Sequence, residues 1–233
     1  MQRRGTCLAA SAGLRFLSKS MMRLFMSERF LSTFPPEGSA PIPVNHDQLT
    51  SFTTKHLRVE VPQELQSFWR NVGSGYFGDR ALHVFGSATQ HRDSYDIWNT
   101  KDFWPEIYPP PEHGGPVFFA ETCFGAQLGF RWENGQCIYV LFVIDTFEAF
   151  RVASTGDELF EHVLSDRFAL MDEAHWAGAT QRFGTLSAGM HFAPIVSPLV
   201  GGTGSPGNLC QESANVHFRT AIATYRAVNG IAS

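Results

Sequence analysis

Apolar positions at helical spacing predict two helices at the start of the folded region. In VPQELQSFWRNVG, which begins at Val61, apolar residues recur at i, i+3, i+4 and i+7 and share one helix face. These residues are Leu65, Phe68, Trp69 and Val72. Gly73 is placed to end this helix in the left-handed conformation. The preceding stretch VNHDQLTSFTTKHL predicts a shorter helix with Asn45 as its N-cap.

Runs of apolar, β-branched and aromatic residues predict strands in the middle of the chain. The runs are DRALHVFG, PVFFAET, AQLGFRW, QCIYVLFVI and FEAFRVAS. Asn134-Gly135, between the third and fourth runs, is a strong hairpin signal. Thr155 and Glu158 form a capping box for a helix over TGDELFEHVLSDRF. An antiparallel meander of about four to six strands, covered by helices on one face, is an α+β fold.

The hydrophobic pattern weakens after Phe168. The stretch 182–208 is rich in Gly, Pro and Ser and predicts a loop with apolar anchors. A closing helix is expected over SANVHFRTAIATYRAVNG, with Ser213 as its N-cap and Gly230 at its C-terminus.

The N-terminal part of the chain differs in composition from the rest. Residues 1–25 carry five basic side chains and no acidic one. This basic extension fits either a targeting segment or a sequence ahead of the true start of translation, at one of the methionines up to Met26. Residues 26–43 contain FPPEGSAPIP and are expected to be a Pro-rich linker. Residues 44–233 are then expected to form a single α+β binding domain.

The charge of the chain indicates the class of partner, and its cysteine content indicates the compartment. The formal net charge is −4, but five of the 18 basic residues lie in the extension, so the rest carries 13 basic against 22 acidic residues, a net of −9. An acidic domain repels nucleic acid and attracts basic partners. No apolar run approaches the roughly 18 residues that a membrane span needs. The four cysteines are widely separated, which indicates a reducing, cytoplasmic compartment.

The spacing Gly73-x-Gly75-x-x-Gly78 matches the letters of a dinucleotide-binding loop, but its context differs. In such a loop the glycines follow a strand and open a helix, whose N–H groups meet the pyrophosphate. Here a helix ends at Gly73 and a strand begins after Gly78. The loop therefore faces the carbonyl end of the helix, which repels phosphate, and we expect no nucleotide cofactor.

Other catalytic and metal-binding patterns are also missing. The nine histidines are scattered, without H-E-x-x-H or a close pair on one helix. There is no G-x-S-x-G elbow, and the glycine-rich stretch from Gly201 to Gly207 has no following lysine. We expect no metal site and no catalytic centre.

The connection between Thr89 and Pro116 is rich in aromatic and acidic residues and ends in a proline run. We expect a helical turn between Ser94 and Trp104. Long ordered connections often carry a function, but aromatic side chains also close cores. The two interpretations, an interaction surface and a lid on the core, stay open at this point.

Several runs of residues resemble those of SUKH-superfamily proteins. One is VPQELxxFWxxVGSGY, from Val61 to Tyr76, which is similar to their opening helix and glycine turn. A second is FFAxxxFGxxLGF, from Phe118 to Phe130, followed by a hairpin and by AxxxxxLFxxVL, from Ala153 to Leu164. The tail FxPxxxPxxGG, from Phe192 to Gly202, is similar to tails of immunity proteins associated with type VI secretion. The resemblance covers roughly residues 44–167.

This resemblance implies an α+β binding module, and many members of the superfamily are immunity proteins. Such proteins bind a polymorphic toxin, often a nuclease or other basic domain, and block its active site. We therefore expect a non-catalytic protein that neutralises a basic toxin domain without cofactor, metal, nucleic acid or membrane. Composition and loop position suggest the following contact residues: Tyr76, Phe77, Asp93, Tyr95, Asp96, Trp98, Asp102 and Trp104.

Two other functions fit the same sequence. One is a regulatory or scaffold module of the same fold that binds an endogenous protein. The other is an enzyme whose site is assembled from isolated residues such as His83, His113 and Asp145, which requires these side chains to converge in a pocket.

Overall fold

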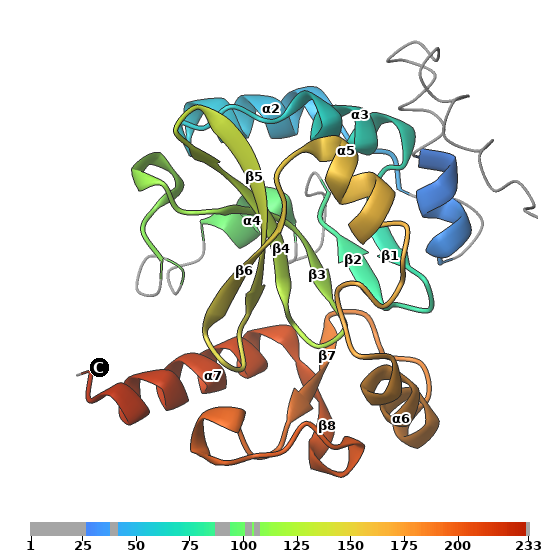
Figure 1. Cartoon of the computed structure of the whole chain (residues 1–233), viewed down its shortest axis with the longest axis vertical. Helices are drawn as coiled ribbons and strands as arrows, with labels where there is room; N and C mark the ends of the chain where they lie inside the picture. The colour runs from blue at the N-terminus through green and yellow to red at the C-terminus, as the bar shows by residue number, and fades with distance from the viewer. Residues whose placement is uncertain (1–26, 38–41, 87–93, 101–103, 105–107, 232–233) are drawn as a thin grey trace, which may run out of the picture.

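The computed structural model describes residues 27–37, 42–86, 94–100, 104 and 108–231 (Figure 1). The fold is α+β, and its main sheet has six antiparallel strands in the order of the sequence. This confirms the predicted class and the predicted meander. The strands of this sheet are β1 (Gly75–Phe77), β2 (Leu82–Val84), β3 (Val117–Thr122), β4 (Gln127–Glu133), β5 (Gln136–Val143) and β6 (Glu148–Ala153).

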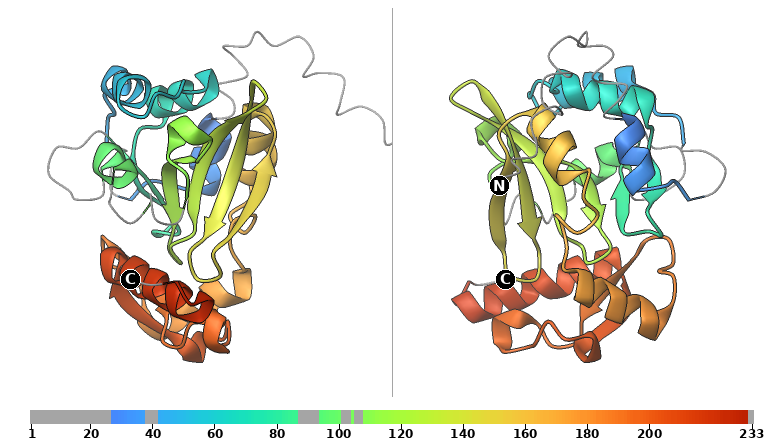
Figure 2. Two further views of the ribbon diagram at one scale, coloured as in Figure 1. Left: turned by 90° about the vertical axis from the view of Figure 1, so that its left-hand side faces the viewer. Right: turned by 45° about the vertical axis from the view of Figure 1, so that its right-hand side comes forward.

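The predicted helices are present, with somewhat different ends. They are α2 (His46–Lys55), α3 (Gln63–Asn71), the short α4 (Tyr95–Asn99), α5 (Gly156–Glu158) with a π-helical turn η3 (Leu159–Val163), and α7 (Ala214–Asn229). The helix expected to reach Phe168 thus ends at Val163. Helices α2 and α3 lie across one end of the sheet, and α7 lies at the opposite end (Figures 1 and 2).

Local signals fix the ends of these elements as the sequence predicts. The side chains of Asn45, Thr155 and Ser213 each accept a hydrogen bond from a backbone N–H in the first turn of their helix. Asn134 and Gly135, both with positive φ, form the turn between β4 and β5. The glycine motif after α3 has positive φ at Gly73, and a helix precedes a strand as we expected. The strand β1 begins at Gly75, however, inside the motif and not after Gly78.

The folded region begins ahead of Val44, which corrects the linker predicted for residues 26–43. Residues 27–33 form a helix that contacts α3 and β1. The rings of Phe30 and Phe34 are 1% and 0% exposed and belong to the main core. Two bridges, from Pro36 to Phe77 and from Ile42 to Ser74, tie the following residues to β1. Two buried aromatic rings stabilise this segment in spite of its prolines.

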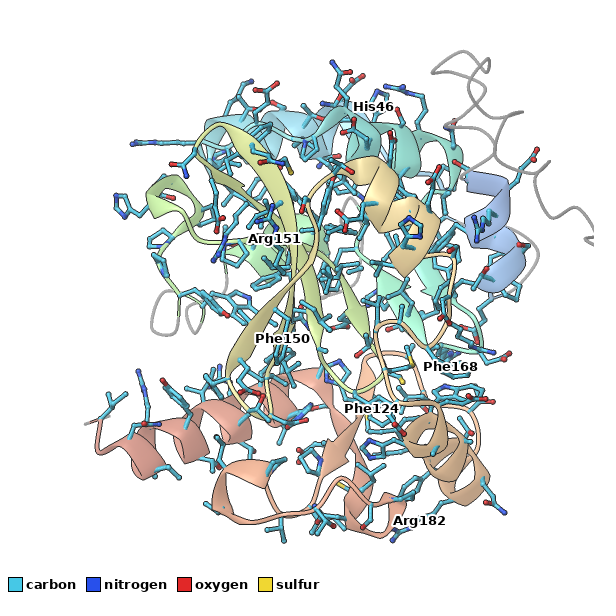
Figure 3. The ribbon with its side chains drawn as sticks, in the orientation of Figure 1. His46, Phe124, Phe150, Arg151, Phe168 and Arg182 are labelled. Carbon is cyan, nitrogen blue, oxygen red and sulfur yellow. The ribbon has the colours of Figure 1, made fainter. Side chains whose placement is uncertain are left out.

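The main core is dominated by aromatic side chains. All six residues of β3 are buried, so both faces of this central strand are covered. The Trp98, Trp104 and Phe218 rings pack edge to face, with centroids 5.0–5.9 Å apart. At the far edge of the sheet, β6 is less covered, and Phe150 and Arg151 are exposed there (Figure 3).

A C-terminal unit follows the main sheet, and part of it lies in the stretch 182–208, where the sequence predicts a loop. We call residues 173–231 the C-terminal unit, and it lies below one end of the sheet (Figure 2). Besides α7 it contains α6 (Glu173–Phe183), the paired strands β7 (Met190–Pro194) and β8 (Leu209–Ser213), and the 3₁₀ turns η4 (Pro198–Val200) and η5 (Pro206–Asn208). Apart from α7, these elements bury few residues, so their sequences show little periodicity.

Within the described residues, no helix is long and apolar enough to cross a membrane.

Candidate functional site

Four of the predicted contact residues are buried in the core, which corrects the contact surface expected from sequence. The exposed fractions of Phe77, Tyr95 and Trp98 are 0%, and that of Trp104 is 6%. Helix α4 brings Tyr95 and Trp98 into the core. The Tyr95 hydroxyl forms a hydrogen bond of 2.6 Å with the Thr53 hydroxyl of α2. Burial raises the pKa of Tyr95 above its usual range. These side chains close the core, as the second interpretation of this connection proposes.

The other predicted contact residues are scattered or not described. Tyr76 is half-buried on β1, and its hydroxyl accepts a hydrogen bond from the Gly189 N–H at 2.7 Å. Asp96 is half-buried on α4. Asp93 and Asp102 lie outside the described residues. The six predicted residues that the structure describes therefore do not form one surface.

Carboxylates gather instead on another face, which we call the acidic surface: Glu60, Glu64, Asp157 and Glu158, together with Trp132. The start of α3, the β4–β5 hairpin and α5 meet there. The Trp132 indole N–H donates to the Glu60 carbonyl at 2.9 Å. The Gly156 backbone lies so close to Glu64 that an added Cβ would sit 2.3 Å from its Cγ.

The acidic surface is held in place by local hydrogen bonds. Glu158 accepts a hydrogen bond from the Ser154 N–H at 2.7 Å, and its own N–H donates to the Thr155 hydroxyl at 3.1 Å. Arg131, on the same hairpin, is already ion-paired with Glu133. Because this surface combines exposed carboxylates with a half-buried indole, it suits lysine and arginine side chains, which pair with acids and stack on aromatic rings.

A thiol and a hydroxyl lie beneath the acidic surface. Burial, with a smaller contribution from the charge of Glu64, raises the pKa of the Cys137 thiol to about 12. The Tyr139 hydroxyl on the same strand is buried, which raises its pKa as well. Since a thiolate and not a thiol is the nucleophile, Cys137 is unsuited to covalent catalysis.

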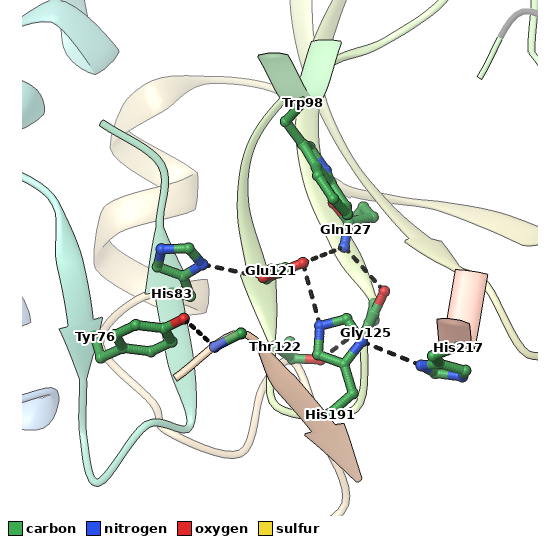
Figure 4. Close-up of polar contacts among 11 residues, drawn as sticks. Tyr76, His83, Trp98, Glu121, Thr122, Gly125, Gln127, His191 and His217 are labelled. Carbon is green, nitrogen blue, oxygen red and sulfur yellow. Dashed lines mark hydrogen bonds and ion pairs between the residues drawn. The ribbon is translucent and has the colours of Figure 1, made fainter. Parts of the chain in front are cut away.

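A second set of polar residues crosses the end of the main sheet (Figure 4). We call this connected set of side chains the buried polar chain: Trp98, Gln127, His83, Glu121, His191, His217 and Asp145. In the register of the sheet, Glu121 on β3 lies opposite His83 on β2 and Gln127 on β4. Directly opposite residues share a face, so these three side chains form a row. His83 Nδ1 lies 3.0 Å from Glu121 Oε1, and the Gln127 amide donates to Glu121 Oε2 at 3.0 Å. The Trp98 indole N–H donates to Gln127 Oε1 at 2.6 Å.

The C-terminal unit adds two histidines to this row. His191 on β7 places Nε2 3.3 Å from Glu121 Oε2, at ion-pair distance. Its Nδ1 lies 3.1 Å from Nδ1 of His217 on α7, whose Nε2 lies 2.8 Å from Asp145 Oδ1. Gly125 makes room for the two rings, because an added Cβ would lie 2.9 Å from His191 and 3.0 Å from His217.

The buried polar chain holds charge away from water. Glu121, His191 and His217 are 3%, 2% and 3% exposed. Burial raises the pKa of Glu121, but His191, by its charge and hydrogen bonding, and the hydrogen bond from His83 outweigh burial and hold this pKa well below its usual range. A carboxylate without such partners would be costly to bury.

The residues considered for an enzyme do not converge. His83 and Asp145 both belong to the buried polar chain, but Glu121, His191 and His217 separate them. His113 is exposed on η2 (Pro111–His113) and makes no hydrogen bond or ion pair with either. In the described part of the chain, no group of three or more His, Cys, Asp or Glu side chains has a geometry that could hold a metal ion.

Sequence reasoning missed both the acidic surface and the buried polar chain. The one available signal was Glu121, an acidic residue inside the apolar run PVFFAET. All of this strand is buried, so its carboxylate needs partners, but the sequence does not say which ones.

Comparisons with known proteins show the fold. No model of a known protein family matches the chain, and no curated protein matches it. Among solved structures, the crystal structure of Atu4351 from Agrobacterium tumefaciens superposes with a TM-score of 0.56. The match covers 84% of this chain and 87% of that chain at 13% sequence identity, so the two proteins share a fold.

Proposed function

We propose that this protein is a non-catalytic binding protein that neutralises a basic toxin domain by covering it. The observation that carries this proposal is the acidic surface, where Glu60, Glu64, Asp157 and Glu158 lie near the β4–β5 hairpin that carries Trp132. The net charge of −9 over residues 26–233 acts in the same direction. The resemblance to SUKH-superfamily immunity proteins adds to it.

The acidic surface and the indole have different parts in such a complex. Exposed carboxylates attract a basic partner over a distance and raise the association rate. A tryptophan at the centre of an interface excludes water and slows dissociation. Covering the toxic domain needs no chemistry from this chain.

The first experiment is capture of partners by the tagged full-length protein from a lysate of its own source at low salt, followed by mass spectrometry. We expect one basic protein in stoichiometric amount. That protein should stop growth when it is expressed alone, and coexpression of the present chain should restore growth. A captured partner that is harmless alone would instead identify a regulatory module, and the absence of any basic partner would contradict the proposal.

Charge-neutralising variants test the surface itself. We expect Glu60→Gln combined with Asp157→Asn to raise the Kd for the partner about tenfold at low salt, which corresponds to roughly 1.4 kcal/mol. The affinity should also depend less on salt concentration. The matched control is Glu28→Gln combined with Glu112→Gln, two exposed carboxylates on other elements. Equal affinities and salt slopes for the two double variants would remove the acidic surface from the interface.

A further inference from the structure

The connection between β7 and β8 presents aliphatic side chains to solvent. Ile195, Val196 and Val200 are 59%, 47% and 57% exposed, and the residues between them are half-buried. Single exposed aliphatic residues are common on protein surfaces, but a contiguous group of them is typical of an interaction site. We call this stretch, residues 195–200, the apolar loop.

The apolar loop is held in one conformation. Ile195 donates its N–H to the Asn208 carbonyl at 2.7 Å. The Asn208 side chain accepts from the Val196 N–H at 2.9 Å and donates to the Val196 carbonyl at 2.8 Å. The Ser197 hydroxyl caps the turn η4 by accepting from the Leu199 N–H at 3.2 Å. A fixed backbone thus displays the exposed side chains, so that binding through them costs little ordering.

The rest of the connection is anchored as well. An added Cβ at Gly202 would collide with the Val196 carbonyl oxygen, so the chain turns back closely on itself. Pro206 packs on α6 at Gly178, where a side chain would leave it no room. Arg182 of α6 donates to the Pro206 carbonyl at 2.7 Å. The apolar loop is therefore supported by α6 as well as by its own ends.

The apolar loop belongs to a part of the chain without charge. Residues 192–211 contain no acidic or basic residue and no histidine, whereas residues 26–233 as a whole carry a net charge of −9. The C-terminal unit lies at the opposite end of the sheet from α2 and α3, and the acidic surface includes the start of α3 (Figures 1 and 2). The uncharged loop and the acidic surface therefore belong to opposite ends of the molecule.

This distribution of charge selects the kind of partner. A charged partner finds no complementary charge on residues 192–211, and an anionic lipid surface finds no lysine or arginine there. Two copies of this chain repel each other through their acidic residues, and an uncharged face lets them meet where this repulsion is small. In a two-fold symmetric contact each patch meets its own copy, so a charged patch opposes itself whereas an aliphatic patch is self-complementary.

We propose that the apolar loop is the contact face of a symmetric dimer of this chain. Ile195, Val196 and Val200 of one copy pack against the same residues of the other, and the two acidic surfaces point away from each other. With the proposed function, one dimer holds two basic partners at once. The dimer contact itself does not depend on that function.

The contact is expected to be weak and reversible. A stable interface covers roughly 800 Å² on each partner, which is more than one short loop supplies. We therefore expect a Kd on the order of 10 to 100 µM. Single chains and dimers should coexist in this range of concentration.

Sedimentation equilibrium of the full-length protein measures this association. Between roughly 1 and 300 µM, which brackets the expected Kd, the average mass should rise from that of one chain toward that of two. Added salt should preserve or strengthen the dimer, because it screens the repulsion between acidic copies. The mass of a single chain at every concentration would leave the loop to a different protein or a lipid surface and overturn the proposal. Dissociation of the dimer by salt would also contradict it.

A matched pair of substitutions locates the contact. Ile195→Glu places an unpaired carboxylate in the contact and should raise the dimer Kd by about tenfold or more. Ile42→Glu is the control, because Ile42 is 61% exposed, close to the 59% of Ile195, but lies beside β1 in the N-terminal segment. Val200→Glu should act as Ile195→Glu does, and it serves the test if the first variant does not fold. Equal Kd values for the loop variants and the control would place the contact elsewhere and refute the proposal.

Amide chemical shifts locate the contact in the unaltered protein. On dilution from about 300 to about 10 µM, a range that spans the expected Kd, the amide signals of Val196, Val200 and Gly201 should move. Those of the β4–β5 hairpin should stay constant. Movement at the hairpin with a constant apolar loop would assign the dimer to another face, against the proposal.

Discussion

The core of the main sheet and the joint with the C-terminal unit are both buried, but they are stabilised in different ways. The core is packed with aromatic rings such as Phe30, Trp98 and Phe142, which are nearly or fully buried. The joint contains charged and polar side chains with equally little exposure, Glu121, His191 and His217 among them. The packing of the core does not depend on ionisation, whereas the joint contains the buried charge of Glu121.

The difference shows how burial acts on each kind of side chain. Burial of apolar groups stabilises the folded state by roughly 25 cal/mol per Å², whatever their neighbours are. Burial of polar groups destabilises the folded state unless each donor meets an acceptor. A substitution in the core is thus expected to lower stability through lost packing volume. A substitution in the joint is expected to lower stability by leaving a buried charge or hydrogen-bonding group without its partner.

The largest effect is expected in the core. We predict that Trp98→Ala lowers the free energy of unfolding by about 3–5 kcal/mol, because it leaves a large cavity and also removes the hydrogen bond to Gln127. Chemical denaturation measures this change. Trp176→Ala, at a half-buried position on α6, should cost less. An equal cost at both positions would mean that burial does not separate the two regions.

The second effect is expected in the joint and depends on pH. We predict that Glu121→Gln costs about 3 kcal/mol at neutral pH, because histidines lose their buried counter-charge. The pKa of Glu121 is lowered in the folded state, so its contribution is present above the unfolded value of about 4.3 and is lost as the pH falls through the folded value. Denaturation at several pH values should show a steep acid loss in the original protein and a flatter curve in the variant. Parallel curves would contradict the assigned role of Glu121.

A pair of glycines separates backbone strain from crowding in the joint. Gly125 and Gly135 have nearly the same φ, +80° and +79°, but only an added Cβ at Gly125 would meet neighbouring side chains. We predict that Gly135→Ala costs about 1 kcal/mol from strain alone, and that Gly125→Ala costs about 1–3 kcal/mol because it also displaces the two histidines. Thermal melts measure both. Equal costs would show that the histidine pair has room to move.

The smallest effects are expected at the helix caps. Thr155 accepts from the Glu158 N–H at 3.1 Å, and Ser213 in the C-terminal unit accepts from the Val216 N–H at 3.4 Å. We predict that Thr155→Ala costs about 1 kcal/mol and that Ser213→Ala costs somewhat less, because its bond is longer. Denaturation of the two variants side by side tests this order. A larger cost for Ser213 would mean that the start of α7 carries more of the joint than its cap shows.

The share of the structure that could be predicted from the sequence differs between the main sheet and the joint. The strands β2 to β6, the Asn134-Gly135 turn and the caps at Asn45, Thr155 and Ser213 follow from local rules, and they are present as predicted. The short strands β1, β7 and β8 were not predicted. The predicted contact residues failed where aromatic side chains serve the core. An aromatic residue in a long connection has the same local signature whether it closes a core or meets a partner.

The sequence by itself determined the α+β class, the meander order and the acidic balance of the domain, because periodicity, turn residues and net charge act locally or by simple sum. Only the tertiary structure decided that Phe30 and Phe34 belong to the core and that Glu121 meets His191. It also decided that His217 reaches Asp145 across 72 positions of the chain. Contacts over such separations depend on how the elements pack, and a histidine or glutamate has the same place in the sequence whether it is buried or exposed. The physical reason is that pairing of buried polar groups is a property of the packed fold and not of any one segment.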